Sequence, residues 1–147
     1  MAGIIIVYWS GTGNTERMAE LIAEGATAGG AEAVRKAVSQ TTVAEALKYD
    51  AIALGSPSMG TEVIEEGEME PFVAELEKSV EGRTLALFGS YDWGDGEWMR
   101  NWADRMKGQG AKLLDEQGLA VHLTPGGEDE EHCRDLGRRL AKAILKA

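Results

Sequence analysis

The hexapeptide Ser10-Gly11-Thr12-Gly13-Asn14-Thr15 directly follows the apolar run Ile4-Ile5-Ile6-Val7-Tyr8-Trp9, and this junction decides the fold. The β-branched and aromatic run is typical of a buried parallel strand. Apolar residues at helical spacing follow the hexapeptide: Met18, Leu21, Ile22 and Ala26. The hexapeptide is therefore predicted to be a tight turn from strand to helix, where backbone N–H groups and a helix N-terminus attract a phosphate.

This phosphate turn, residues 10–15, carries no positive charge. No Lys or Arg lies between Met1 and Glu16, so the lysine of a nucleoside-triphosphatase loop, G-x-x-x-x-G-K-[ST], is missing. Glu16 also stands where the dinucleotide fingerprint G-x-G-x-x-G needs its third glycine. We expect the turn to hold one phosphate through neutral donors, with Gly11 and Gly13 supplying unusual backbone angles. An ordinary strand–helix turn is the alternative, because turns favour the same residues.

Length and composition limit the class of protein. The 147 residues fit one domain, residues 1–147. The sequence has no long apolar window and no basic start, so we expect neither a membrane span nor a signal peptide. The net charge of −10 argues against binding nucleic acid or anionic lipid, whose phosphates need cations. The single cysteine, Cys133, excludes an internal disulfide, suits a reducing cytoplasm and is expected to be a packed thiol. The chain offers no plausible zinc or calcium ligand set.

Further strands are predicted at residues 33–38, 51–54, 85–88 and 119–123, alternating with helices. Such alternation predicts an α/β fold, a parallel sheet with helices on both faces. Ligands of these sheets bind at the carboxyl ends of the strands. Loops rich in Gly, Ser and aromatic residues follow three of the strands, so we expect these loops to converge on one edge of the sheet.

The second and third of these loops carry groups that suit a flat ligand. The second offers the thioether of Met59 beside Gly60, and the third offers Tyr91 and Trp93. Aromatic rings and sulfur grip a polarisable ring well, although core or turn roles for these side chains are the alternative. One phosphate together with a large flat ring suggests flavin mononucleotide, FMN.

Several segments follow the pattern of a known family: Tyr8-Trp9-Ser10-Gly11-Thr12-Gly13-Asn14-Thr15-Glu16, Leu54-Gly55-Ser56, Met59-Gly60, Glu70-Pro71-Phe72, Leu87-Phe88-Gly89-Ser90-Tyr91, Trp93-Gly94-Asp95-Gly96 and Trp98-Met99. Nearly the whole chain resembles the short-chain, clostridial-type flavodoxins, and no long insertion interrupts the last strand. The resemblance implies a flavodoxin-like, doubly wound three-layer sandwich with a five-stranded parallel sheet of order 2-1-3-4-5. It also implies a low-potential electron carrier rather than an enzyme, which shuttles electrons between redox enzymes on non-covalently bound FMN through the semiquinone/hydroquinone couple.

The resemblance assigns each loop a role in binding FMN. Residues 10–15 would bind the phosphate, Met59 would cover the inner face of the ring and Trp93 the outer face. The peptide 60–61 would turn to hydrogen-bond N5 of the one-electron-reduced ring, and Glu62 would meet N3. The complete implied set, without catalytic residues or metal ligands, is Ser10, Gly11, Thr12, Gly13, Asn14, Thr15, Ser56, Pro57, Ser58, Met59, Gly60, Thr61, Glu62, Ser90, Tyr91, Asp92, Trp93 and Gly94.

The resemblance also places the remaining parts of the third loop and of the last turn. Ser90, Tyr91 and Gly94 would line the pocket of the ring and the ribityl chain. Thr124 and Pro125, which follow the last strand, would close one edge of the site.

Two positions depart from the family pattern. Asp92 stands where relatives typically have glycine, and its charge, if it faces the ring, would lower the potential of the second electron step. Thr61 stands where relatives often have Asp, Ser or Asn, and its branched side chain would make the peptide turn costlier. Acidic residues surround the proposed ring, and we expect Glu65, Glu66 and Glu68 to belong to a solvated face.

Other classes of protein remain as alternatives. A flavodoxin-like FMN reductase acting on a quinone or metal complex would need a proton donor, and His122 and His132 lie on none of the three loops. A receiver domain would need an Asp and a Lys at strand ends, where this chain has Ser10, Ser56 and Ser90. A module that binds another phosphorylated aromatic compound is the third alternative. For the electron carrier, we expect a monomer whose acidic face docks on basic surfaces of ferredoxin-type redox partners.

Overall fold

The computed structural model describes residues 3–11 and 13–145, and its strands form one parallel sheet. The strands are β1 (Gly3–Tyr8), β2 (Glu32–Ala37), β3 (Ala51–Gly55), β4 (Thr84–Tyr91), β5 (Lys112–Leu113) and β6 (Leu119–His122). Their order is β2-β1-β3-β4-β5, with β6 also paired to β4. The predicted α/β class and strand order 2-1-3-4-5 are therefore confirmed.

The fifth position of the sheet is shared by two short strands rather than filled by one. β5 pairs with the start of β4, where Lys112 lies opposite Thr84, and β6 pairs with its end, where Leu119 lies opposite Phe88. Between the two strands the chain leaves the sheet, and the carboxylate of Asp115 there accepts hydrogen bonds from Arg139 at 2.8 and 3.2 Å. This ion pair joins the segment between β5 and β6 to the last helix.

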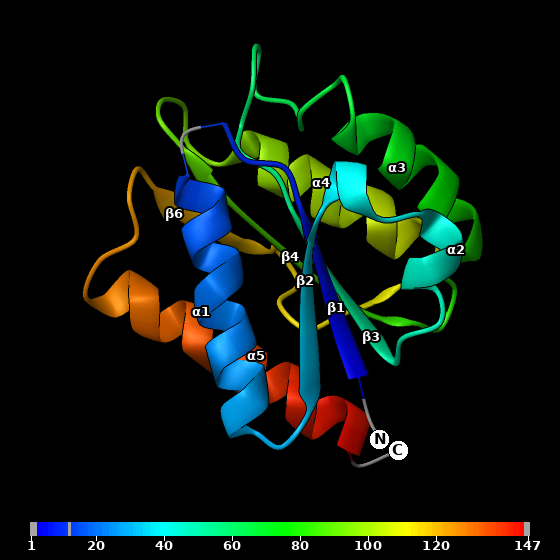
Figure 1. Ribbon diagram of the computed structural model, residues 1–147. Helices are drawn as coiled ribbons and strands as arrows, with labels where there is room; N and C mark the ends of the chain where they lie inside the picture. Colours follow the sequence, from blue (N-terminus) through cyan, green and yellow to red (C-terminus); the bar gives the residue numbers. More distant parts are fainter. Residues whose placement is uncertain (1–2, 12, 146–147) are drawn as a thin grey trace.

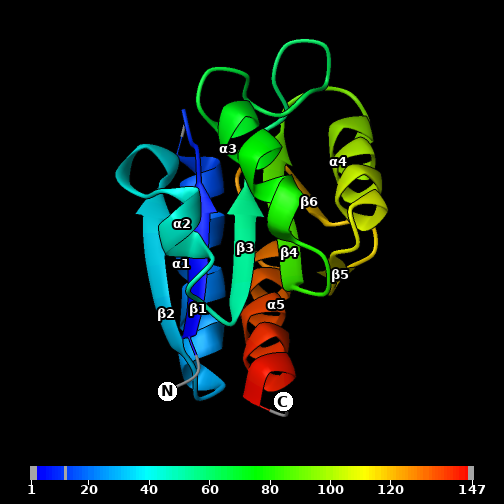
Figure 2. The same cartoon turned by 90° about the vertical axis from the view of Figure 1, so that its right-hand side faces the viewer.

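Helices cover both faces of the sheet (Figures 1 and 2). α1 (Asn14–Ala28) and α5 (Glu128–Leu145) lie on one face, and α2 (Val43–Ala46), α3 (Met69–Leu76) and α4 (Glu97–Gly108) lie on the other. Short 3-10 turns follow β2 at Val38–Gln40 and α3 at Glu77–Ser79. Among residues 3–11 and 13–145, no helix has the length and apolar character needed to cross a membrane.

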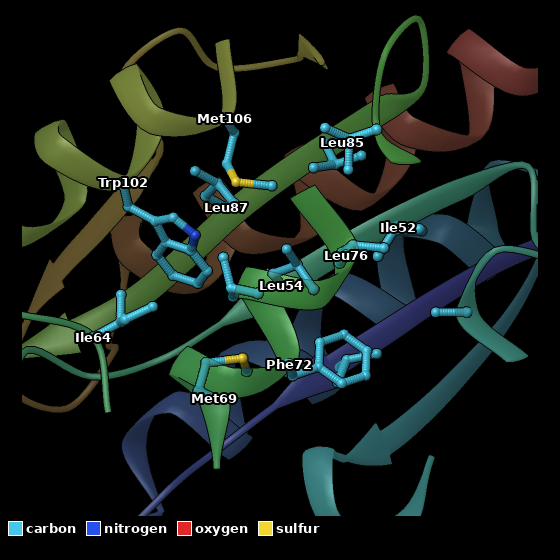
Figure 3. Packing of buried hydrophobic residues seen from close by; sticks show 14 of the residues in the cluster. Ile52, Leu54, Ile64, Met69, Phe72, Leu76, Leu85, Leu87, Trp102 and Met106 are labelled. Carbon is cyan, nitrogen blue, oxygen red and sulfur yellow. The ribbon is translucent and has the colours of Figure 1, made fainter. Parts of the chain in front are cut away.

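Alternate residues of each strand pack into two hydrophobic cores, one on each face of the sheet. Ile5 and Val7 of β1 pack toward α3 and α4, whereas Ile4 and Ile6 pack toward α1 and α5. Figure 3 shows the first core, where Trp102 and Met106 of α4 meet side chains from the sheet and from α3. The apolar residues of α4 share one buried face: Trp98, Met99, Trp102 and Met106.

α1 and α5 pack in close backbone contact because glycines lie at their crossing. A Cβ atom at Gly25 would come within 1.8 Å of the Arg134 carbonyl oxygen, and one at Gly137 within 2.0 Å of the Ile22 carbonyl oxygen. This interlock fixes the position of α1, the helix that begins at the phosphate turn.

Candidate cofactor-binding site

The three predicted loops begin side by side at one edge of the sheet. The register places Tyr8 of β1 opposite Gly55 of β3, and Gly55 opposite Phe88 of β4. All of these strands run in the same direction (Figure 2), so the loops that follow them leave the sheet together. The Ser58 N–H donates to the Ser90 carbonyl at 3.0 Å and joins the second loop to the third.

A cavity of about 470 Å³ lies between the loops, a volume typical of small-molecule and cofactor sites. Its walls come from all three loops and from the segment after β6. The lining residues carry neutral donors and aromatic rings, with one acid and no Lys or Arg among them: Trp9, Gly11, Asn14, Pro57, Ser58, Met59, Gly60, Ser90, Tyr91, Asp92, Trp93 and Leu123.

The phosphate turn presents the free N-terminus of α1. Gly13 is the N-cap, at φ 97°, and has no side chain to bind the first helical amides, which leaves them for an anion. The Gly13 N–H itself donates to Ser10 Oγ at 3.0 Å, which folds the turn back on itself. A Cβ atom at Gly13 would meet no atom within 4 Å, so open space lies next to the turn. Thr12, also predicted to bind the phosphate, lies outside the described residues.

Polar side chains of the phosphate turn contact two distant parts of the chain. Thr15 Oγ1 and Ser90 Oγ lie 3.2 Å apart, and both side chains are buried. Asn14 Oδ1 accepts a hydrogen bond from Thr124 Oγ1 at 3.1 Å. The structure thus brings the segment after β6 to the edge of the turn, where Thr124 was expected.

The second loop forms a small closed turn at its tip. The Met59 N–H donates to the Val63 carbonyl at 2.8 Å, and the Val63 N–H donates back to the Met59 carbonyl at 2.9 Å. Residues 60–62 form the turn between them, with positive φ angles at Gly60 (52°) and Glu62 (58°). A positive φ is uncommon for a residue other than glycine, and such conformations gather at functional sites.

The side chain of Glu62 lies against the start of α4 rather than in the cavity. One carboxylate oxygen accepts a hydrogen bond from the Glu97 N–H at 3.1 Å. A Cβ atom at Gly94 would approach the Glu62 carboxylate to 2.5 Å, so the glycine makes room for it. The contact of Glu62 with N3 of FMN stays a prediction.

The base of the second loop is held by a buried carboxylate, and the expectation that Glu65 belongs to a solvated face is wrong. Glu65 is 9% exposed, and its oxygens accept hydrogen bonds from the N–H groups of residues 67, 68 and 69 at 2.7 to 2.8 Å. The Glu65 N–H donates to Ser56 Oγ at 2.9 Å. Ser56 is fully buried, so its hydroxyl holds the second loop from the interior of the protein.

Two aromatic side chains at the end of β4 and in the third loop, Tyr91 and Trp93, line the cavity. The ring of Tyr91 lies 5.5 Å from that of Trp98 and 5.1 Å from that of His122, whereas Trp93 is 60% exposed. His122 Nε2 lies 3.0 Å from the Asp92 carbonyl oxygen. His122 therefore contacts the third loop directly, which its sequence position outside the three loops did not suggest.

Sequence reasoning missed two residues of the cavity wall, Trp9 and Leu123. Trp9 is predicted to be the last residue of the buried strand, but its position at the carboxyl end of β1 is itself a signal that it reaches the site. Leu123, predicted to end the last strand, instead follows β6 with φ 62° and is 45% exposed. No sequence signal marked that conformation.

The strand order, the cavity at the carboxyl edge and the neutral phosphate turn define an α/β protein that binds a mononucleotide. Residues 6–137 match the family model described as Flavodoxin. The chain is 47% identical to the flavodoxin of Clostridium beijerinckii, over 92% of this chain and 97% of that one. It is 41% identical to the flavodoxin of Megasphaera elsdenii, over 94% and 98% of the two chains. This chain therefore belongs to the flavodoxin family.

Solved structures agree with this assignment. Two-electron-reduced Megasphaera elsdenii flavodoxin superimposes with a TM-score of 0.85 over 95% of this chain and 98% of that one, at 41% identity. A flavodoxin from the domain Archaea gives a TM-score of 0.87 over 97% and 99%, at 29% identity. Flavodoxins bind FMN and carry electrons at low potential rather than acting as enzymes. The predicted cofactor and the predicted role as an electron carrier are thus confirmed.

Proposed function

We propose that this chain shuttles single electrons between redox enzymes on FMN held between its three loops. The observation that carries the proposal is a cavity with a neutral phosphate turn at one end and aromatic and thioether side chains at the other. FMN supplies the redox chemistry, and the protein supplies binding, orientation and the electrostatic field around the ring. Anaerobic spectroelectrochemistry of the FMN-loaded protein tests this: two separate one-electron steps are expected, and a single two-electron step would contradict it.

For the individual side chains we propose the roles that the family pattern assigns. Residues 10–15 bind the phosphate, and Met59 and Trp93 cover the two faces of the ring. Asn14, Met59 and Trp93 all line the cavity, which supports these roles. Trp93 is also highly exposed, and stacking on a ligand would remove the free-energy cost of leaving its ring in water.

Trp93 provides the sharpest test of these roles. Trp93→Ala should weaken FMN binding about five- to ten-fold, since an aromatic stacking contact contributes about 1 kcal/mol or more. Leu145→Ala is the matched control, because Leu145 is also an exposed apolar side chain, at 51%, but lies at the far end of α5. Equal FMN affinities for the two variants would contradict the stacking role.

We further propose that partners dock through basic surfaces, as the ferredoxin-type clients implied by the family would. Exposed acids lie on the second loop, on the third loop and at the start of α4: Glu66, Asp92, Asp95 and Glu97. Opposite charges steer association and make its rate fall with salt. With a basic c-type cytochrome as electron acceptor, Glu66→Lys should slow the reaction at low salt more than Glu81→Lys, which lies near the opposite edge of the sheet. Equal slowing by both variants would contradict docking at this face.

We place the protein in the cytoplasm as a monomer, with residues 1–147 as one flavodoxin-like domain. Cys133 is a free thiol and is fully buried. A free thiol suits a reducing compartment but does not require one. Sedimentation of the FMN-loaded protein tests the monomer, and a concentration-dependent mass would contradict it.

A further inference from the structure

Among the described residues, one side-chain hydrogen bond joins the first loop of the site to the second. Trp9 Nε1 donates to Glu68 Oε1 at 3.1 Å, across 59 residues of sequence. Trp9 lines the cavity at the end of β1, immediately before the phosphate turn, and its backbone N–H donates to the Gly55 carbonyl at 3.0 Å. The indole is therefore fixed at its backbone by β3 and at its ring nitrogen by the second loop.

The backbone that carries the acceptor of this bond is itself held in place. The Glu68 N–H donates to Glu65 Oε1 at 2.8 Å, and Glu65 is anchored by Ser56 at the end of β3. Although the Glu68 side chain is exposed, its backbone cannot move without breaking hydrogen bonds to a buried carboxylate. A carboxylate carried on an anchored backbone has fewer positions open to it than one on a mobile loop.

The ring of Trp9 also touches the phosphate turn. A Cβ atom at Gly11 would lie 3.2 Å from the Cη2 atom of the indole, so the ring packs directly on the backbone of Gly11. The position of the ring therefore limits the position of the Gly11 backbone at the start of the turn.

We propose that the Trp9–Glu68 hydrogen bond couples the phosphate turn to the second loop, so that the two halves of the cofactor site are ordered together. Trp9 is a wall of the site, and Glu68 is a positioning residue that acts on the cofactor through Trp9. The inference rests on the proposed placement of FMN in this cavity. It adds that the bond contributes to FMN affinity from outside the cavity.

A double-mutant cycle of Trp9→Phe and Glu68→Ala, read by the dissociation constant for FMN, tests the coupling. Each single variant should bind FMN about five-fold more weakly, the effect of one net hydrogen bond. The double variant should bind no more weakly than the worse single variant. Losses that multiply to about twenty-five-fold would overturn the coupling.

Two further variants separate positioning from loss of charge. Glu68→Gln keeps an oxygen that can accept the indole N–H and should restore FMN affinity to within about two-fold of the parent. Glu75→Ala removes an exposed acid of α3, outside the three loops, and should leave affinity unchanged. A Glu68→Ala variant that behaves like Glu75→Ala, or a Glu68→Gln variant that binds as weakly as Glu68→Ala, would overturn the proposal.

Hydrogen exchange of the protein without FMN gives a readout that does not depend on the cofactor. In Glu68→Ala, the amides of residues 10–15 should exchange faster than in the parent, although the substitution lies in the other loop. Unchanged exchange in the turn would overturn the coupling even where FMN binds. A parent protein that fails to bind FMN would instead contradict the proposed function and leave the exchange result to decide the coupling.

Discussion

Thr15 Oγ1 lies 3.2 Å from Ser90 Oγ, so two buried hydroxyls join the first turn of α1 to β4 across 75 residues of sequence. Ser90 lines the cavity, so the pair forms part of its wall next to the phosphate turn. A buried hydroxyl without a partner costs free energy, so each of these groups depends on the other.

Thr15→Val should lower the free energy of unfolding by about 1–3 kcal/mol, because it leaves Ser90 Oγ buried without its partner. The double variant Thr15→Val/Ser90→Ala should lose less than the sum of the single variants, since it removes both hydroxyls. Urea unfolding of the protein without FMN measures all three values. Strictly additive losses would show that the two hydroxyls do not depend on one another.

Asp92→Asn should raise the potential of the second electron step by some tens of millivolts. Asp92 lines the cavity and is exposed, so its charge opposes the addition of negative charge to the ring through solvent. Unit charges interact by about 1 kcal/mol or less in water, and about 59 mV corresponds to a tenfold change for one electron. A redox titration measures the shift, and an unchanged or lowered potential would count against a charge effect of Asp92.

Gly137→Ala should destabilise the protein by about 1–3 kcal/mol or more, because its Cβ would meet the Ile22 carbonyl oxygen at 2.0 Å. The matched control is Gly108→Ala in α4, where a Cβ atom has no neighbour within 4 Å. That control should unfold at the same or slightly higher urea concentration, as alanine favours the helix. Similar losses for both variants would argue against a close α1–α5 contact.

Much of the fold was predictable because its strongest signals are local. The apolar runs of β1, β3 and β4 and the helical spacing in α1 and α4 each specify an element, and alternation of the elements specifies a parallel sheet. The edge of the site followed from the same reasoning, since loops after parallel strands leave the sheet together. Met59 and Trp93 lie on that edge as expected.

The remaining features depend on contacts between distant residues. Glu65 is buried because the N–H groups of residues 67–69 need an acceptor there, which no spacing reveals. At the division of the edge strand, Asp115 pairs with Arg139, 24 residues later. The placement of His122 beside Asp92 depends on the register of β6 against β4. Local patterns carry no information about such pairings.

Burial, followed by the nearby charges of Asp129 and Glu130, raises the pKa of the Cys133 thiol to about 12. In the unfolded chain a thiol has a pKa of about 8.5. Between these values the unfolded state releases a proton that the folded state keeps, so the stability linked to this thiol is complete below about pH 8.5 and falls as the pH rises. The decline approaches about 1.4 kcal/mol per pH unit.

Cys133→Ala removes this titration and should flatten the fall of unfolding free energy with pH. Urea unfolding of parent and variant in parallel, from neutral pH to about pH 10, measures the difference, because all other groups titrate alike in both. Identical slopes would show that the thiol titrates alike in the folded and unfolded states.

The central claim is that neutral amides and hydroxyls of residues 10–15 bind a phosphate while the second and third loops hold the ring. A titration of the protein, first freed of cofactor, with FMN and then with riboflavin, which lacks the phosphate, tests it most directly. We predict one FMN bound per chain and at least about ten-fold weaker binding of riboflavin, since several hydrogen bonds to a charged group are lost. Equal affinity for the two compounds, or no binding of FMN, would contradict the account.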